Sequence, residues 1–435
     1  MRFDGSYHNA EINVYSDVIE KHSEHRLKYY CSEIYTSGRN RRIYTSEQFG
    51  YPFLSNSDVV SANPFLSCEY NSKKYGYDER AVLRKGMILT GRVGAIGQTA
   101  FVSGQLEKAK AMGSDNIIRI CVKPEHHNGF IYAYLASKIG NLSFWKHATG
   151  GVQPFITDVM VGELPIPKFP EDFQLEVDNL IQESARLREE AAEALEEAHR
   201  LIESRFNIAS KKKSSCVSIK SIMSSHNKRF EAFYHTSTNR SVYDYITSNF
   251  EYKLLGDLTS RIFRPGIFKR EYVSNGVTFL GGADILMAIP SSEKKLSFRQ
   301  VEKMPELKVK KDWILVTCGG TIGNTVLIDR QLEQCVVSQH VMRIVPKDEI
   351  LKGYLYAVLS SSIGKDLITM FTTGSVIPQV EAHHLELVPI PLLENDLMEK
   401  IDDLVSTYVS KIEISKEKET KAISMVEQEI EKWNN

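Results

Sequence analysis

The sequence predicts an α+β fold that is built twice, as two duplicated mixed α/β domains separated by two long helices. Three observations support this. The chain has 435 residues, short motifs recur in order about 225 residues apart, and a long segment without Gly or Pro follows each copy. A chain of this length normally forms two to four domains. The boundaries we expect are residues 1–168 for the first domain, 169–208 for the central helix, 209–392 for the second domain and 393–435 for the C-terminal helix.

The internal repeat covers most of each half of the chain. Its matches keep their order and nearly constant spacing, which chance would not produce. The matched segments are 2–8 with 229–235, 53–59 with 279–285, 85–99 with 311–325, Arg119-Ile120 with Arg343-Ile344, 132–140 with 356–364, 149–150 with 373–374, and 165–167 with 389–391.

Each copy begins with short β-type runs and ends in a Pro-Ile-Pro block. The runs at 87–90 and 313–317 are followed by glycines, as expected for strands that enter tight turns. A helix is predicted at 130–139 and again at 354–363. The proline blocks mark where each globular domain stops.

Residues 171–205 show a heptad pattern over a segment without Gly or Pro. Phe173, Leu180, Leu187, Ala194 and Leu201 recur every seven residues, and the other seam is filled by Val177, Ser184, Ala191 and Ala198. The second long segment, 397–433, has a similar apolar stripe that weakens around 416–421. Because neither helix can bury its stripe alone, we expect the two helices to pack on each other, with their remaining faces open to partner subunits.

The charge is divided into blocks although the whole chain carries a net charge of −1. Residues 1–170 carry +4 and 207–392 carry +7, whereas 171–206 carry −7 and 393–435 carry −5. A basic block attracts phosphate even in a neutral chain. The sequence shows neither an apolar signal region nor a membrane-length apolar stretch, so we expect a cytoplasmic protein.

The sequence lacks the motifs of the catalytic classes considered. It contains no Pro-Pro, which an adenine methyltransferase motif requires, and no P-loop. Glu306-Leu307-Lys308 has the spacing of a nuclease tail, but no Pro-Asp precedes it. None of the six cysteines forms a Cys-x-x-Cys pair, and the His126-His127 and His383-His384 pairs do not match in the repeat, so we predict no catalytic residue and no metal site.

This layout resembles the specificity subunits of type I restriction–modification enzymes over nearly the whole chain. The resemblance is carried by the duplicated order of motifs, namely 229–232 (Arg-Phe-Glu-Ala), 255–258 (Leu-Gly-Asp-Leu), the strands that run into Gly-x-Ile-Gly, the Thr-Gly-Gly-Val-Gln-Pro-Phe-Ile segment at 149–156, and each Pro-Ile-Pro before a long helix. The family's acidic-Gln pair after the proline block is missing here, and the first domain lacks a clear Leu-Gly-Asp.

The resemblance implies a function and partners. Each globular unit would be a target-recognition domain that reads one half of a split site in double-stranded DNA. The helices would form an antiparallel coiled coil with pseudo-twofold symmetry, set the gap between the half-sites, and dock two methyltransferase subunits and, through the complex, restriction subunits. The chain itself would bind no cofactor, since S-adenosylmethionine and ATP are expected in the partner subunits.

Candidate DNA contacts come from basic loops. Arg pairs bidentately with guanine and Asn with adenine, which points to Arg39, Asn40, Arg41 and Arg42 as base readers, unless this is only a solvated loop. Lysines suit phosphate contacts. The remaining candidates are Lys73, Lys74 and Arg92 in the first domain and Arg261, Arg264, Lys269, Arg270, Lys294 and Lys295 in the second.

Three other functions fit the same sequence less well. The chain would be the specificity partner of a fused methyltransferase–nuclease of another restriction class, an enzyme whose motif is not recognised, or a helical scaffold for proteins only. Gene neighbourhood, a methylation or cleavage assay, and a DNA-mobility assay separate these alternatives.

Overall fold

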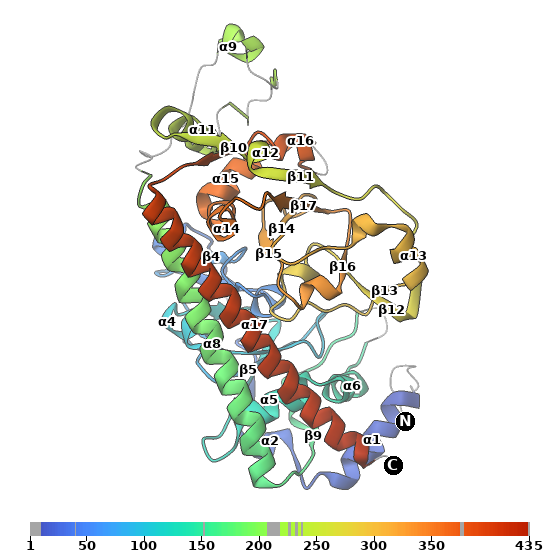
Figure 1. The fold of residues 1–435 in the computed structure, drawn as a ribbon. Coiled ribbons are helices and arrows are strands. Elements are labelled where there is room, and N and C mark those ends of the chain that lie inside the picture. The colour runs from blue at the N-terminus through green and yellow to red at the C-terminus, as the bar shows by residue number, and fades with distance from the viewer. Residues whose placement is uncertain are drawn as a thin grey trace. The chain divides into compact units, whose positions relative to one another are not determined.

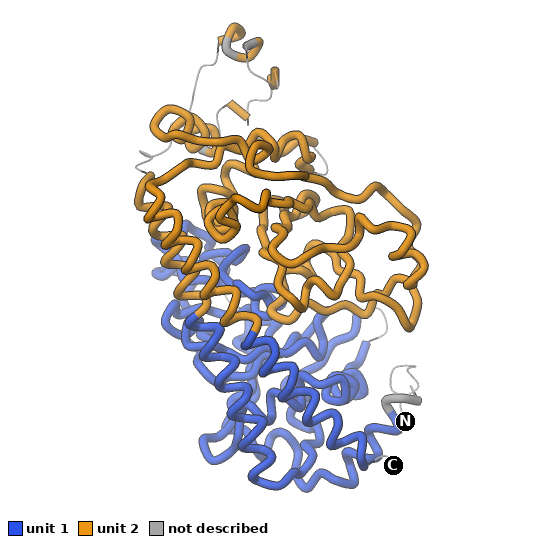
Figure 2. The backbone as a smooth tube through the Cα atoms, viewed as in Figure 1, with its two compact units in different colours: residues 1–190, 414–435 blue, residues 191–413 orange. Residues whose placement is uncertain are grey.

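The computed structural model describes residues 10–39, 41–150, 153–206, 218–224, 228–230, 234–235, 238–374 and 378–433. The chain forms two compact units (Figure 2). Unit 1 is Met1–Glu190 with Ile414–Asn435, and unit 2 is Ala191–Glu413. Each unit therefore contains one globular domain together with part of both long helices, so the helices belong to the domain cores.

The largest sheet of each unit has four antiparallel strands in the same order. The strand-to-strand register is also repeated, because Leu89 lies opposite Arg119 in unit 1 and Leu315 lies opposite Arg343 in unit 2. In chain order the strands are β2 (Cys31–Tyr35), β5 (Ile88–Gly91), β6 (Thr99–Phe101) and β8 (Ile117–Val122), and β11 (Thr259–Phe263), β14 (Ile314–Thr317), β15 (Thr325–Leu327) and β17 (Val341–Pro346).

A smaller mixed sheet of three strands accompanies each large sheet, with one antiparallel and one parallel pairing. A two-stranded pairing joins the start of each domain to its Pro-Ile-Pro block. The strands are β1 (His25–Arg26), β3 (Gly50–Leu54), β4 (Glu69–Ser72), β7 (Met112–Gly113) and β9 (Pro165–Ile166), and β10 (Tyr252–Leu254), β12 (Tyr272–Leu280), β13 (Lys295–Leu296), β16 (Val336–Val337) and β18 (Pro389–Pro391). The predicted duplication is thus confirmed strand by strand.

Helices cover the large sheets (Figure 1). The principal ones are α1 (Ala10–His22), α5 (Asn128–Ala136) and α6 (Lys138–His147) in unit 1, and α11 (Thr238–Asn249), α14 (Lys352–Ser360) and α15 (Ser362–Met370) in unit 2. Shorter helices are α2 (Leu27–Tyr30), α3 (Asn56–Val59), α4 (Gly104–Lys108), α7 (Asp158–Gly162), α9 (Ile219–Ser224), α12 (Leu255–Leu258), α13 (Phe298–Lys303) and α16 (Ala382–Leu385).

The predicted continuous helices at 130–139 and 354–363 were wrong at their C-terminal ends. Each is interrupted by a serine, Ser137 or Ser361, whose backbone is extended. The serine hydroxyl accepts a hydrogen bond from the backbone N–H of Gly140 or Gly364 and so caps a second helix. A serine before a new helical run is the sequence signal for this interruption.

One buried arginine in each domain holds its sheets together. Arg119 and Arg343 have no exposed surface, although charged residues are rarely buried without partners. Arg119 donates to the carbonyls of Ile117 and Ala81 at 2.8 and 3.1 Å, and Arg343 donates to those of Val341 and Ser338 at 2.6 and 2.8 Å. Burial lowers the pKa of each guanidinium to about 10. These matched arginines are structural residues and make no part of a surface site.

The two long helices are α8 (Glu171–Glu203) and α17 (Asn395–Lys432), and their prediction is confirmed. They run antiparallel in unit 1, because Ser184 contacts Ser415 while Phe169, just before α8, stacks on Trp433. One seam of α8 was predicted correctly. In the other seam, Leu187 is buried as predicted, whereas Ile181, Leu195 and Ile202 are buried in place of Leu180, Ala194 and Leu201. The helix contacts both its partner and a domain, which widens its buried face beyond a simple coiled-coil seam.

Acidic side chains of the long helices cap helices of the domains. Asp178 accepts a hydrogen bond from the backbone N–H of Gly129 at the start of α5, and Asp402 does the same for Gly353 at the start of α14, both at 2.7 Å. Both glycines are required, since a Cβ atom would lie 2.7–2.8 Å from the carboxylate. Carboxylates are stabilising at helix N-termini. Some of the acidic residues of α8 and α17 therefore attach these helices to the domains.

Candidate nucleic-acid interface

In each unit, one loop leads from the large sheet to the small sheet. In unit 1 it follows β2 and carries Arg39, Arg41 and Arg42, whereas Asn40 lies outside the described residues. In unit 2 the loop follows β11 and carries Arg264, Lys269 and Arg270. The structure thus places the two predicted groups of basic residues at topologically equivalent positions.

Asn71 organises the loop of unit 1. This buried side chain accepts a hydrogen bond from the N–H of Ile43 at 2.7 Å and donates to the carbonyls of Arg41 and Gly76 at 3.0 and 2.9 Å. Gly76 is essential to this arrangement, because a Cβ atom there would lie 2.2 Å from Oδ1 of Asn71. The arginine loop and the turn that carries Lys73 and Lys74 are consequently fixed side by side.

The arginines of this loop differ in how they are held. Arg42 forms an ion pair with Asp115 at 2.6 Å and lies over the ring of Phe53, with 5.5 Å from Cζ to the centroid. Arg39 and Arg41 have exposed side chains. Arg42 is therefore fixed in direction, whereas Arg39 and Arg41 extend into solvent.

Aromatic side chains are interleaved with the basic residues of unit 1. Nζ of Lys73 donates to the carbonyl of Gln48 at 3.0 Å and lies 5.4 Å from the ring of Tyr51, and Nζ of Lys74 lies 5.1 Å from that of Tyr75. Exposed aromatics on the same segment are Tyr44, Phe49, Tyr75 and Tyr77. A basic, aromatic surface of this kind suits contact with nucleic acid.

The loop of unit 2 is held by partners on both sides. Arg264 forms an ion pair with Glu381 at 2.5 Å, and Arg270 donates to Oε1 of Gln339 at 3.2 Å. The amide of Gln300 donates to the carbonyl of Lys269 at 2.7 Å and accepts from the N–H of Glu271 at 3.0 Å. These contacts make the basic loop a defined surface feature.

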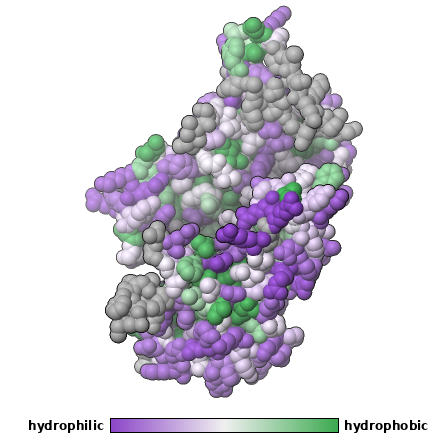
Figure 3. Space-filling model, turned by 180° about the vertical axis from the view of Figure 1, so that it is seen from behind, coloured by the Kyte–Doolittle hydropathy of each residue, from purple (hydrophilic) through white to green (hydrophobic). Residues whose placement is uncertain are grey.

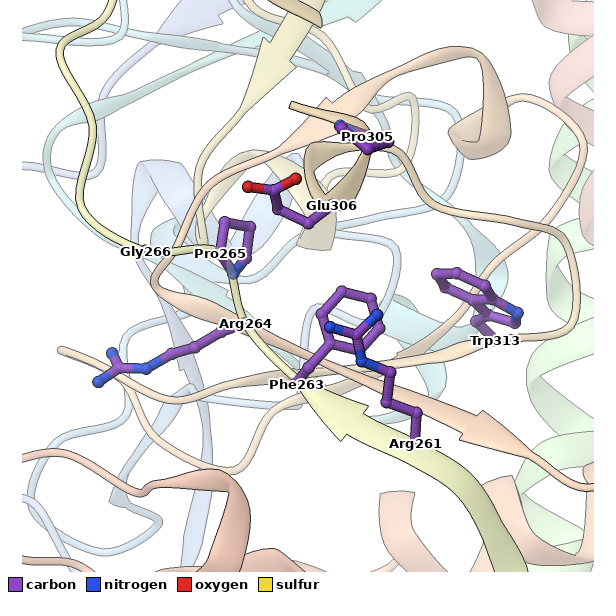
Figure 4. A pocket seen from close by; sticks show the side chains of 8 residues that line it. All are labelled: Arg261, Phe263, Arg264, Pro265, Gly266, Pro305, Glu306 and Trp313. Carbon is purple, nitrogen blue, oxygen red and sulfur yellow. The ribbon is translucent and has the colours of Figure 1, made fainter. Parts of the chain in front are cut away.

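A surface pocket of about 390 Å³ lies at the start of this loop (Figure 4). The Arg261 guanidinium is stacked on Phe263, with 3.9 Å from Cζ to the ring centroid. Arg264 points away from that pair. The other lining residues are Pro265, Gly266, Pro305, Glu306 and Trp313. The pocket therefore combines a stacked cation, an indole and a carboxylate.

Residues 212–424 match the family model described as type I restriction modification DNA specificity domain. The match covers 213 of the 435 residues and identifies this segment as a type I restriction–modification DNA specificity domain. Because unit 1 repeats the strand order and register of unit 2, the specificity fold occurs twice in the chain. The search of curated proteins gave no match.

Solved structures of the same kind align with the chain at low identity. They include the S subunit of a type I restriction–modification system from M. genitalium, with 13% identity, 94% of each chain covered and a TM-score of 0.34. Another is the HsdS subunit from Thermoanaerobacter tengcongensis, with 16% identity, 94% of this chain and 95% of that chain covered, and a TM-score of 0.29.

The other predicted contact residues occupy different settings. Lys294 is exposed and Lys295 half-buried, at the start of β13. Arg92 follows β5, where its N–H donates to the carbonyl of Asn116 and its carbonyl accepts from Ile156. The neighbouring Gly91 faces the carbonyl of Ala95, which would lie 2.5 Å from an added Cβ atom. The close backbone approach that Gly91 allows is thus made by the chain itself.

The described residues show no group of three His, Cys, Asp or Glu side chains placed to hold a metal ion. Burial raises the pKa of Cys31 to about 12 and that of Cys68 to about 11, which keeps these thiols protonated. Cys216 lies outside the described part of the chain. No described helix is long and apolar enough to cross a membrane, and the face shown in Figure 3 mixes hydrophilic and hydrophobic residues.

Several residues of the specificity fold were not predicted from the sequence. Asn71 and Gln300 fix the two basic loops through backbone contacts, and only their partners in space reveal this role. Ile267 was overlooked although it stands between basic residues in a Pro-Gly loop, which is a visible sequence signal.

Proposed function

We propose that each unit reads one half of a bipartite target in double-stranded DNA through the loop between its two sheets. The chain would dock methyltransferase subunits and, through them, restriction subunits. S-adenosylmethionine and ATP would be bound by those partners, and the chain alone would neither methylate nor cut DNA. The observation that carries the proposal is that two basic loops stand at equivalent positions of a duplicated specificity fold.

The side chains suggest a division of roles. Exposed Arg39 and Arg41 are proposed as base readers of unit 1, with Asn40 between them and Arg42 directed by Asp115. Lys73 and Lys74 are proposed to contact phosphate. In unit 2 the proposed readers are Arg261, Arg264 and Arg270, and the proposed phosphate contacts are Lys269, Lys294 and Lys295. Arg92 has Cys318 at the repeated position, so its contact would belong to one half-site.

The roles can be separated by measuring affinity and specificity together. Arg41→Ala should relax discrimination in one half-site by about 1–3 kcal/mol for each lost base contact. The double variant Lys73→Ala/Lys74→Ala should weaken binding to matched and mismatched DNA similarly. It should also reduce the slope of log affinity against log salt concentration by about 2. The measurement is binding of the chain with its methyltransferase partner to DNA of several sequences over a range of salt.

A matched control is Lys28→Ala, at an exposed lysine that is part of neither loop and forms an ion pair with Glu163. It should leave specificity and the salt slope unchanged. If Arg41→Ala weakens binding to all DNA sequences equally, the loop only positions DNA and the proposed reading role is wrong.

The helices are proposed to set the spacing between half-sites. α8 and α17 each continue unbroken across the unit boundary, at 190/191 and 413/414. Four residues inserted at both points would lengthen each helix by about 6 Å, which corresponds to at most about two base pairs. Mapping of methylated sites should show the longer spacer. Two-residue insertions, which rotate the following segment by about 200°, should abolish function.

A further inference from the structure

Ile267 is the most exposed large hydrophobic residue of the described chain, with 94% of its surface accessible. It lies at the tip of the unit 2 loop, after Pro265 and Gly266. Arg264 precedes this tip and Lys269 and Arg270 follow it. Full burial of an isoleucine side chain is worth about 1.5–3 kcal/mol, so a partner that covers Ile267 would gain binding free energy of up to that order.

The loop holds Ile267 outward by anchoring the residue beside it. Phe268 packs in a hydrophobic cluster with Phe279, with ring centroids 6.2 Å apart. The Arg270 guanidinium lies near both rings, with 6.0 and 5.5 Å from Cζ to the centroids. Gln300 binds the backbone on either side of Arg270. The loop is therefore preorganised, with one apolar side chain directed away from the protein.

The charge around Ile267 indicates what would cover it. Of the three cationic side chains within three residues on either side, Arg264 is paired with Glu381, whereas Arg270 donates to the neutral amide of Gln339. The positive charge that Lys269 and Arg270 leave beside Ile267 favours a polyanion over an apolar protein surface. Isoleucine has no hydrogen-bond donor or acceptor in its side chain. The distinctly apolar feature on a base edge in the major groove is the 5-methyl group of thymine.

We propose that Ile267 contacts the 5-methyl group of a thymine in the half-site read by unit 2. This inference depends on the proposed DNA-reading function and adds a specificity-determining residue to it. The flanking cations bring the loop to the groove, and Ile267 discriminates by apolar contact. Because the side chain is uncharged, its contribution does not depend on counterion release.

The test uses the chain assembled with its methyltransferase partner. Selection from a random DNA pool first gives the motif, and Arg270→Ala identifies the half-site read by unit 2. Each thymine there is then replaced by uracil, which removes only the methyl group. One replacement should weaken wild-type binding about three- to fivefold, as burial of a single methyl-sized group predicts. The same replacement should have no effect on Ile267→Ala, whose salt slope stays at the wild-type value.

The matched control is Ile219→Ala, which truncates an isoleucine in α9 that is 72% exposed. It should keep the wild-type response to uracil. The inference is overturned if no thymine in that half-site responds to uracil, or if Ile267→Ala keeps the response. Failure of the wild-type complex to select any motif would instead refute the proposed function.

Discussion

The two units share one fold but build the core of their helix pairs from different chemistry. In unit 1 the carboxylate of Glu419 is buried, accepts a hydrogen bond from the hydroxyl of Tyr132 at 2.6 Å and pairs with Arg188 at 2.7 Å. Ser184 contacts Ser415 at 2.9 Å beside them. These residues form the polar cluster of unit 1.

Unit 2 has apolar or aromatic residues at the repeated positions, 224 residues away. Leu195 stands in place of Glu419, Ile412 in place of Arg188 and Tyr408 in place of Ser184. Tyr408 stacks on Tyr356, the counterpart of Tyr132, with ring centroids 6.2 Å apart. The docking contacts common to both units therefore keep the backbone geometry, while the seam between the helices is free to be polar or apolar.

The largest effect is expected where the two units do not differ. Arg119→Leu and Arg343→Leu should each destabilise their own unit by about 3–5 kcal/mol, because each leaves several buried carbonyls without a donor. Urea unfolding monitored by hydrogen exchange assigns the loss to a unit. Arg80→Ala, at an exposed arginine, should cost less than about 0.5 kcal/mol. A loss in only one unit would show that the repeat is not equivalent at these residues.

A smaller effect should separate the units at the polar cluster. Glu419→Leu leaves Arg188 and the Tyr132 hydroxyl without their acceptor, so unit 1 should lose about 2–4 kcal/mol. Adding Arg188→Ile reproduces the unit 2 pair of Leu195 and Ile412 and should recover most of the lost stability. Leu195→Ala in unit 2 is the reference for ordinary seam truncation. If the double variant stays as unstable as Glu419→Leu, the cluster is needed for more than mutual pairing.

The sequence predicted the duplication and the long helices because these depend on order and periodicity. The weak stripe at 416–421 also indicated an interruption, and the structure shows that Lys416 and Glu419 are buried there. Burial of charged residues could not be foreseen, because it depends on Arg188 and Tyr132, which are distant in sequence. The second seam of α8 is displaced by one residue at three of its positions for a similar reason, since a domain covers part of the helix.

The candidate interface was predicted only in part. Arg39, Arg41 and Arg42 and the unit 2 cations were recognisable as basic loops, and their equivalent positions follow from the fold. That Arg42 is paired with Asp115 depends on an aspartate from a distant strand connection. The sequence marks Ile267 by its place between basic residues in a Pro-Gly loop, but its 94% exposure and the anchoring of Phe268 depend on the folded loop.

The smallest expected effect concerns pH and unit 2. His199 on α8 lies 2.9 Å from the hydroxyl of Ser360, where the unit 1 counterparts are Ile423 and Ala136. Burial lowers the pKa of His199 below its ordinary value of about 6.5, although nearby Glu203 opposes the shift. The unfolded chain then binds the proton more readily. Stability contributed by neutral His199 is therefore present above about pH 6.5 and is lost as the pH falls below it.

This contribution changes by at most about 1.4 kcal/mol per pH unit. His199→Ile, which installs the unit 1 residue, should flatten the stability of unit 2 between about pH 5 and 6.5 relative to wild type. Hydrogen exchange of unit 2 peptides at several pH values measures the difference. His383→Asn replaces an exposed histidine of the same unit and should leave the wild-type slope. If His199→Ile keeps the wild-type slope of stability against pH, the acid sensitivity of unit 2 comes from other groups. Burial of His199 would then not reduce the stability of unit 2 at low pH.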